Sequence, residues 1–171
     1  INKYDREMLV SKYAPIVLLD KQILTLPQNL APNLSRIGVV IAYSAMHKIL
    51  LKDFDEPLIF TSANLSSEPI IASKNEAYEK IANIFDYLLD YNRDIINPID
   101  DSLVVRLENN RPLLLRPARG YYPLSIKLSK FYSKDAVLAL GANQKSQIAI
   151  FYKDNIIISP YIGDLESIDS I

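Results

Sequence analysis

The chain of 171 residues contains no cysteine and a single histidine, His47. The lack of cysteine excludes disulfides, a thiol nucleophile and thiolate metal sites within this chain. One histidine likewise excludes a histidine metal cluster. Neither sign of charge is in excess, because 19 Lys and Arg residues stand against 20 Asp and Glu residues. The sequence therefore offers no bulk basic field for duplex DNA or an anionic membrane, and we expect a cytoplasmic protein.

Long hydrophobic runs are absent as well, and none approaches the roughly 18 residues that a membrane span needs. The hydrophobic content of 49% and the charged content of 23% are typical of a globular protein. The opening segment, residues 1–5, lacks the apolar core of a signal peptide. Because the first residue is Ile1, we expect a piece of a longer protein whose natural start lies upstream.

Short apolar runs rich in branched residues predict strands that are buried on both faces. A helical pattern follows Ser44, and another follows Ser73, where Glu76 completes a capping-box sequence and apolar spacing continues to Leu89. Alternating strands and helices predict an α/β domain with a mixed sheet and helices against it. The expected strands of this domain cover residues 15–19, 37–41, 57–60, 103–105 and 112–115.

The pattern changes after Lys127. A polar connection leads to three apolar runs with short polar joints, which predict an antiparallel meander. Such a meander has one apolar layer and no helix to cover it, so it indicates the start of another domain. We expect a first domain over residues 1–129 and the truncated beginning of a second over residues 130–171. The three meander strands are expected at residues 136–140, 147–151 and 155–159.

Polar side chains follow the apolar run 57–60 directly: Thr61, Ser62 and Asn64. Open α/β sheets bind ligands beyond the carboxyl ends of their strands, where hydroxyl and amide groups can meet a phosphate. The same residues also suit an ordinary loop that caps the next element. Taken by itself, the tripeptide favours the ordinary loop.

A second polar cluster strengthens the nucleotide hypothesis. Arg116 and Arg119 flank a turn after the run 112–115, and rigid guanidinium forks suit a triphosphate or an acyl-adenylate. Two exposed surface arginines of little energetic weight are the alternative. Asp101 and Ser102 offer oxygen atoms for Mg²⁺ or ribose hydroxyls, or else they cap a loop.

Taken in order along the chain, these motifs resemble the HypF family, the carbamoyltransferases of [NiFe]-hydrogenase maturation. The matching segments are residues 14–19, 37–47, 61–70, 100–102 and 116–121. They are similar to the later part of that family's YrdC-like domain, a twisted mixed sheet with flanking helices. Residues 140–145 and 162–165 resemble the start of its next domain, which belongs to the actin-like ATPase superfamily. The resemblance thus implies a YrdC-like sheet followed by the first β-meander of a truncated second domain.

The resemblance also implies an activity for the full-length protein. It makes carbamoyl-adenylate from carbamoyl phosphate and ATP with Mg²⁺, and transfers the carbamoyl group to the C-terminal cysteine of HypE. Zinc belongs to upstream segments of the family, and we expect this stretch alone to be inactive. No catalytic residue is assigned by the motifs. The nucleotide-binding positions of the family fall on Ser62, Asn64, Ser102 and Arg116. Further candidates for substrate or metal contacts are Thr61, Asp101, Arg119 and His47, the last of which packing explains equally well.

Two departures from the family pattern are Pro98, where an arginine is usual, and Tyr161, where a histidine is common. One alternative is a threonylcarbamoyl-AMP synthase that serves tRNA modification, against which the Gly163–Asp164 tail argues. The other is a non-catalytic module that binds a nucleotide or, weakly, RNA. The balanced charge counts against strong RNA affinity, and no membrane contact is expected.

Overall fold

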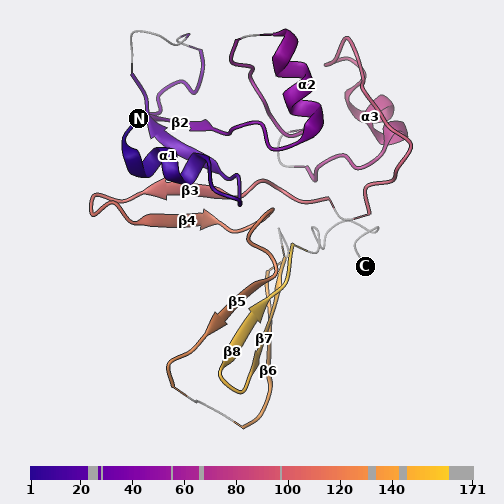
Figure 1. Cartoon of the computed structure of the whole chain (residues 1–171). Helices are drawn as coiled ribbons and strands as arrows, with labels where there is room; N and C mark the ends of the chain where they lie inside the picture. Colours follow the sequence, from indigo (N-terminus) through magenta and orange to yellow (C-terminus); the bar gives the residue numbers. More distant parts are fainter. Residues whose placement is uncertain are drawn as a thin grey trace. The chain divides into compact units, whose positions relative to one another are not determined.

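The computed structural model describes residues 1–22, 27, 29–54, 56–65, 68–96, 98–130, 134–142 and 146–161. The chain divides into two compact units. The first unit consists of Ile1–Leu58 and Asp101–Tyr122, and the second consists of Ile59–Asp100 and Pro123–Ile171. Each unit contains a four-stranded sheet (Figure 1). Within the described ranges, no helix combines the length and the apolar character that crossing a bilayer requires.

The sheet of the first unit is mixed, with the strand order β2-β1-β3-β4. Strand β1 pairs in parallel with β3 and antiparallel with β2, and β3 pairs antiparallel with β4. This confirms the predicted α/β fold with a mixed sheet. Four of the expected runs form these strands: β1 (Ile16–Asp20), β2 (Arg36–Val39), β3 (Leu103–Arg106) and β4 (Pro112–Arg116).

One face of β1 is covered by a short helix, α1 (Lys3–Leu9), which the sequence pattern did not predict. Leu9 of this helix packs with the fully buried Val17 and with Leu19. Burial of such side chains contributes roughly 1.5–3 kcal/mol each. The alternate residue Leu18 stays partly exposed, so the predicted burial on both faces is incomplete for β1.

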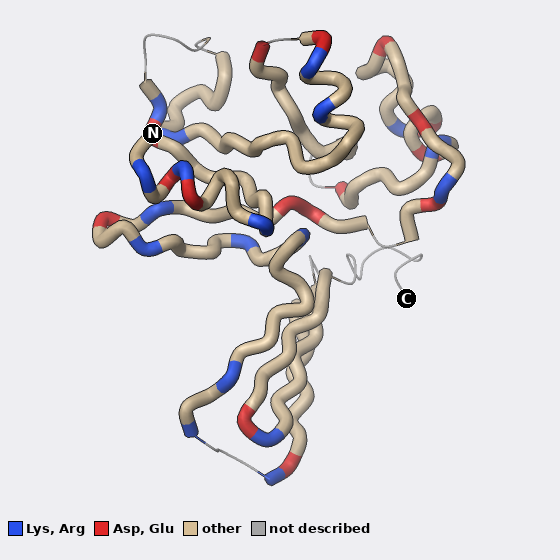
Figure 2. Tube along the Cα trace, in the orientation of Figure 1, with Lys and Arg blue, Asp and Glu red and all other residues tan. Residues whose placement is uncertain are grey.

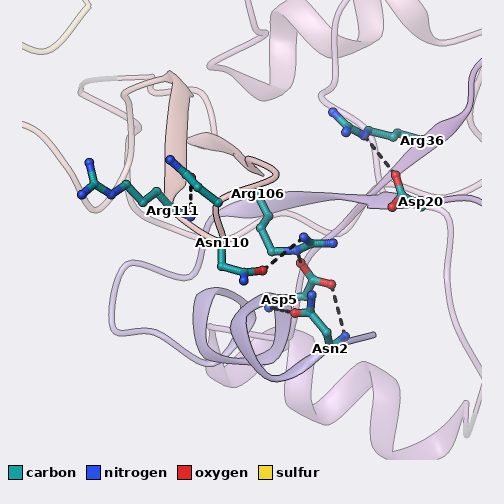
Figure 3. Close-up of polar contacts among 8 residues, drawn as sticks. Asn2, Asp5, Asp20, Arg36, Arg106, Asn110 and Arg111 are labelled. Carbon is teal, nitrogen blue, oxygen red and sulfur yellow. Dashed lines mark hydrogen bonds and ion pairs between the residues drawn. The ribbon is translucent and has the colours of Figure 1, made fainter.

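The helix α1 begins in a capping box. Asn2 accepts a hydrogen bond from the Asp5 amide, and the Asp5 carboxylate accepts one from the Asn2 amide, which satisfies two end amides at once. The same carboxylate forms an ion pair with Arg106 of β3 (Figure 3). A second ion pair joins Asp20 and Arg36, on the paired strands β1 and β2.

The run 57–60 does not form a strand, contrary to expectation. Leu58, Ile59 and Phe60 are 45%, 77% and 56% exposed. A strand requires a neighbour for its hydrogen bonds, and Pro57 has no amide to donate. Composition alone cannot show whether such a neighbour is available, so the expected strand end before Thr61 was wrong.

Both expected helices start at the predicted caps, Ser44 for α2 (Ala45–Asp53) and Ser73 for α3 (Lys74–Ile81). The Ser73 hydroxyl accepts from the Glu76 amide, as a capping box requires, but the Glu76 carboxylate accepts from the amide of Ala72. Helix α3 ends at Ile81 and does not continue to Leu89. Asn83, a poor helix former, follows the end of the helix. Phe85 lies beyond the helix and packs against the buried cluster of Ile71, Ala77 and Ile81.

The second unit contains the predicted meander, formed by β6 (Val137–Leu140), β7 (Ile148–Tyr152) and β8 (Asn155–Ile158). An additional strand, β5 (Leu124–Lys127), pairs antiparallel with β8 and was not predicted. The segments β6, β7 and β8 contain no charged residue, and Lys153 and Asp154 occupy the turn between β7 and β8 (Figure 2).

One face of this second sheet carries a row of apolar side chains that are exposed among the described residues. Leu138, Ile150 and Ile157 lie in one row across the meander and are 61%, 46% and 48% exposed. The boundary after residue 129 remains a prediction.

Candidate functional site

Ser102 joins the start of β3 to the turn that follows β4. Its side chain is fully buried, with 0% exposed. The Oγ atom accepts a hydrogen bond from the Ala118 amide at 2.7 Å and donates one to the Arg119 carbonyl at 2.9 Å. Two main-chain groups of the turn are therefore held by one hydroxyl, which places the two predicted clusters, around residue 101 and around residue 116, side by side.

Arg119 is enclosed by three partners. Its Nε donates to Asp101 Oδ1 at 2.6 Å, and its Nη2 donates to the Ala14 carbonyl at 2.7 Å. Its guanidinium carbon lies 3.6 Å from the centroid of the Tyr43 ring, a cation–π distance. With 25% of its side chain exposed, Arg119 is a fixed cation rather than a loose surface group.

The main chain around Arg119 requires unusual backbone angles. Ala14, whose carbonyl accepts from Arg119, has a φ of 43°, which costs a residue with a side chain roughly 1–2 kcal/mol. Gly120 has a φ of 88°, and a Cβ there would lie 2.6 Å from the Tyr13 carbonyl oxygen. Only glycine fits this approach. The rings of Tyr13 and Tyr121 stack with 4.5 Å between their centroids. This stacking packs the segment around Tyr13 against the turn at Gly120.

Arg116 differs from Arg119 in what it leaves available. Its Nε donates to the main-chain carbonyl of Asp101 at 3.0 Å. Within the described part of the chain, no partner is found for its two terminal amino groups, and the residue is partly exposed. A guanidinium anchored by Nε with both Nη groups available can bind a phosphate in a bidentate manner.

Tyr43 lies against Arg119, just before the cap of α2, and His47 lies in the first turn of that helix. Partial burial raises the pKa of the Tyr43 hydroxyl, and the negative charge of Asp101 raises it further against the opposing effect of Arg119. Tyr43 is therefore a neutral phenol at physiological pH. The His47 ring meets the Tyr43 ring edge-on at 4.7 Å, so His47 is connected to the cluster through packing.

The other predicted residues form a separate loop in the second unit. The Asn64 side-chain amide donates to the carbonyls of Leu65 and Glu68, and its oxygen accepts from the Ser62 hydroxyl. Asn64 thus organises the loop by using all of its polar atoms. Thr61 is exposed, and no hydrogen bond of its hydroxyl is found within the described ranges. Ser66 and Ser67, the remaining serines of the motif, lie outside the described residues.

The donor set does not make a magnesium cage. Among the described residues there is no cluster of three or more acidic or histidine side chains. The Asp101 carboxylate is already bound to Arg119. Mg²⁺ commonly binds through nucleotide phosphates and few protein carboxylates, so these residues do not fit a preformed site for the ion and we assign none of them to it.

Sequence reasoning found Asp101, Ser102, Arg116 and Arg119, and the structure brings these four together. It missed Tyr43, which supplies the aromatic face against Arg119. A signal was present, because Tyr43 directly precedes the helix cap Ser44 and belongs to the motif that carries the resemblance. The roles of the site residues in ligand binding remain predictions.

Comparison with known proteins agrees with this architecture. The family model for Sua5, YciO and YrdC proteins, described as telomere recombination, matches residues 3–118. The chain belongs to this family. A second model, the HypF Kae1-like domain, matches residues 132–171. The YrdC-like first part of the chain and the different second part are thus both recognised by family models.

The relatives of this YrdC-family chain are carbamoyltransferases. It is 41% identical over 167 residues to carbamoyltransferase HypF from Synechocystis sp., over 97% of the chain and 22% of the relative. A crystal structure of full-length HypF in the phosphate- and nucleotide-bound form matches with a TM-score of 0.84 and 36% identity, over 99% of the chain and 27% of that protein. The crystal structure of HypF from T. kodakarensis also matches with a TM-score of 0.84 and 31% identity, over 99% of the chain and 22% of that protein. The chain therefore spans about a quarter or less of these relatives, and the resemblance to HypF is confirmed.

Proposed function

We propose that this chain is the nucleotide-binding part of a carbamoyltransferase of hydrogenase maturation, and that Arg116 binds nucleotide phosphate. The observation that carries the proposal is the geometry of Arg116, which is held by Nε at the Asp101 carbonyl and keeps two terminal amino groups for a ligand. Support comes from the similarity to a HypF whose structure holds phosphate and nucleotide.

In the proposed reaction of the full-length protein, water hydrolyses carbamoyl phosphate to carbamate and inorganic phosphate. A carbamate oxygen attacks the α-phosphorus of ATP, the bond to the β-phosphate breaks, and pyrophosphate leaves, so that carbamoyl-adenylate forms. Negative charge gathers on the nonbridging oxygens of the α-phosphate, and preorganised donors lower the barrier without a side-chain nucleophile. Arg116, held through its Nε atom, supplies such a donor. This mechanism needs no thiol nucleophile, which suits a chain without cysteine.

The later step and the partners belong to the same proposal. The carbamoyl group passes to the C-terminal cysteine of HypE, with release of AMP. We place this transfer in the second part of the chain's longer relatives, which begins here near residue 130. The matched ranges end at residue 118 and restart at residue 132, and the expected boundary after residue 129 lies between them.

The loop around Asn64 is a separate candidate for nucleotide contact. Asn64 holds the loop closed, while the Thr61 hydroxyl and the oxygen of Ser62 are exposed. We propose that these two groups can contact a nucleotide, with Asn64 keeping them in place. Uncharged donors and acceptors suit a ligand that already carries the negative charge.

The proposal is tested by titration calorimetry of ATP with the full-length protein. Arg116→Ala should weaken ATP binding by about 10- to 100-fold, because a charged hydrogen-bonding group contributes roughly 1.5–3 kcal/mol. Arg36→Ala, which removes a comparable arginine with an exposed ion pair, should leave affinity unchanged. Equal affinity in wild type and Arg116→Ala would reject the assignment.

A threonylcarbamoyl-AMP synthase is the second candidate, because the matched Sua5/YciO/YrdC model covers most of the chain. The two functions differ in the substrate that reacts with ATP. ATP–pyrophosphate exchange by the full-length protein should depend on carbamoyl phosphate and not on threonine. Exchange that requires threonine would favour the synthase.

A further inference from the structure

The two arginines of the turn 116–119 differ in how much of each guanidinium is in use. Arg119 uses Nε, Nη2 and one face of the group for Asp101, Ala14 and Tyr43. Arg116 uses Nε alone within the described chain. A phosphate that approached Arg119 would compete with an ion pair of 2.6 Å and a carbonyl contact of 2.7 Å. The geometry therefore indicates that Arg119 holds the turn, while the terminal amino groups of Arg116 can bind a ligand.

Asp101 connects the two arginines. Its main-chain carbonyl accepts from Arg116 Nε, and its carboxylate accepts from Arg119 Nε. This carboxylate is 17% exposed, so its charge is poorly solvated and depends on Arg119 for compensation. Without Arg119, the freed carboxylate would repel a nearby phosphate and attract the terminal amino groups of Arg116.

Ser102 supports the same arrangement from the buried side. Its hydroxyl holds the Ala118 amide and the Arg119 carbonyl, both of which lie just after Arg116 in the chain. The turn is thus fixed between a buried hydroxyl and an enclosed guanidinium.

We propose that Arg119 and Ser102 are positioning residues, which act on the nucleotide through Arg116 and do not touch it. Arg119 keeps the Asp101 charge away from the ligand, and Ser102 keeps the turn in register. This inference rests on the proposed nucleotide-binding role of Arg116.

The test is a double-mutant cycle with ATP as the probe, measured by titration calorimetry in the full-length protein. Arg119→Lys preserves the charge but cannot contact a carboxylate, a carbonyl and a ring together, so ATP affinity should fall about tenfold. In the Arg116→Ala background the same change should cause no further loss, because its effect passes through Arg116. Arg36→Lys, at another arginine paired through Nε with an aspartate, is the matched control and should bind as wild type.

A charge rescue distinguishes positioning from general destabilisation. Adding Asp101→Asn to Arg119→Lys removes the carboxylate that the point charge of lysine no longer holds in the geometry of the Arg119 fork, and ATP affinity should return to within about threefold of wild type. Should Arg119→Lys not fold, Tyr43→Leu removes the aromatic face and the hydroxyl beside Arg119 and Asp101 and enters the same cycle.

The outcomes separate the two proposals. Independent, additive losses from Arg116→Ala and Arg119→Lys would show that Arg119 contacts ATP itself and would overturn the inference. Unchanged affinity in Arg119→Lys would overturn it as well. Unchanged affinity in Arg116→Ala would instead reject the proposed function.

Discussion

Asp5 and Arg106 form an ion pair with 2.8 Å between Oδ1 and Nε, although 101 positions separate them in the sequence. The Asp5 side chain is 10% exposed and also closes the capping box of α1. One carboxylate therefore starts the helix and attaches it to β3. Arg106 continues the contact to Asn110 at 3.4 Å (Figure 3), so the first unit depends on this pair for the position of α1.

Asp5→Asn should destabilise the protein by about 1–3 kcal/mol, because Arg106 would lose a charged partner in a largely buried contact. Urea unfolding followed by circular dichroism measures the free energy of unfolding. Lys3→Ala is the control, since it removes an ion pair of the same helix that is 81% and 58% exposed and should change stability little. Equal losses in the free energy of unfolding from the two substitutions would contradict a stabilising contribution of the ion pair between Asp5 and Arg106.

The fold was predictable where a local signal and its partner both lay in the sequence. The caps Ser44 and Ser73 gave the starts of α2 and α3 correctly, because N-capping depends on residues within one turn. The run 57–60 had the composition of a strand, but these residues belong to none of the strands in the described part of the chain. Whether a neighbour exists is a property of the whole sheet, and a single run of residues does not contain it.

The residues of the site could be predicted from the sequence, but the different roles of these residues could not. Arg116 and Arg119 have the same side chain and lie three positions apart, so the sequence could not show that one is enclosed. The enclosure of Arg119 depends on Ala14 and Tyr43, which precede it by 105 and 76 positions. Burial of Ser102 was equally invisible, because its two partners lie beyond β4.

Glu76 should give α3 a stability that depends on pH. The hydrogen bond from Lys80 is the largest cause that lowers the Glu76 pKa from 4.5, with the Ala72 amide acting in the same direction and burial opposing both. A folded-state pKa below the unfolded value stabilises the protein above pH 4.5, and this stabilisation is lost as the pH falls through the folded-state pKa.

Glu76→Gln should therefore lower the free energy of unfolding by about 0.5–1 kcal/mol at pH 7. The difference from wild type should shrink as the pH falls below 4.5. Urea unfolding at several pH values measures it, with the exposed Glu79→Gln on the same helix as the control. A difference that stays constant with pH would show that the carboxylate charge of Glu76 contributes nothing.

Asn64→Asp should open the loop that precedes α3. The substitution keeps the side-chain size but removes both amide donations, to the carbonyls of Leu65 and Glu68. The Ile71 amide, which donates to the Ala63 carbonyl at 2.9 Å, should then exchange its hydrogen about tenfold faster, as expected when a hydrogen bond to the loop is lost. Thr61→Ala, at an exposed position of the same loop, should leave this exchange rate unchanged. If Asn64→Asp weakens ATP binding while Ile71 exchange stays at the wild-type rate, Asn64 contacts the nucleotide directly and does not act by holding the loop.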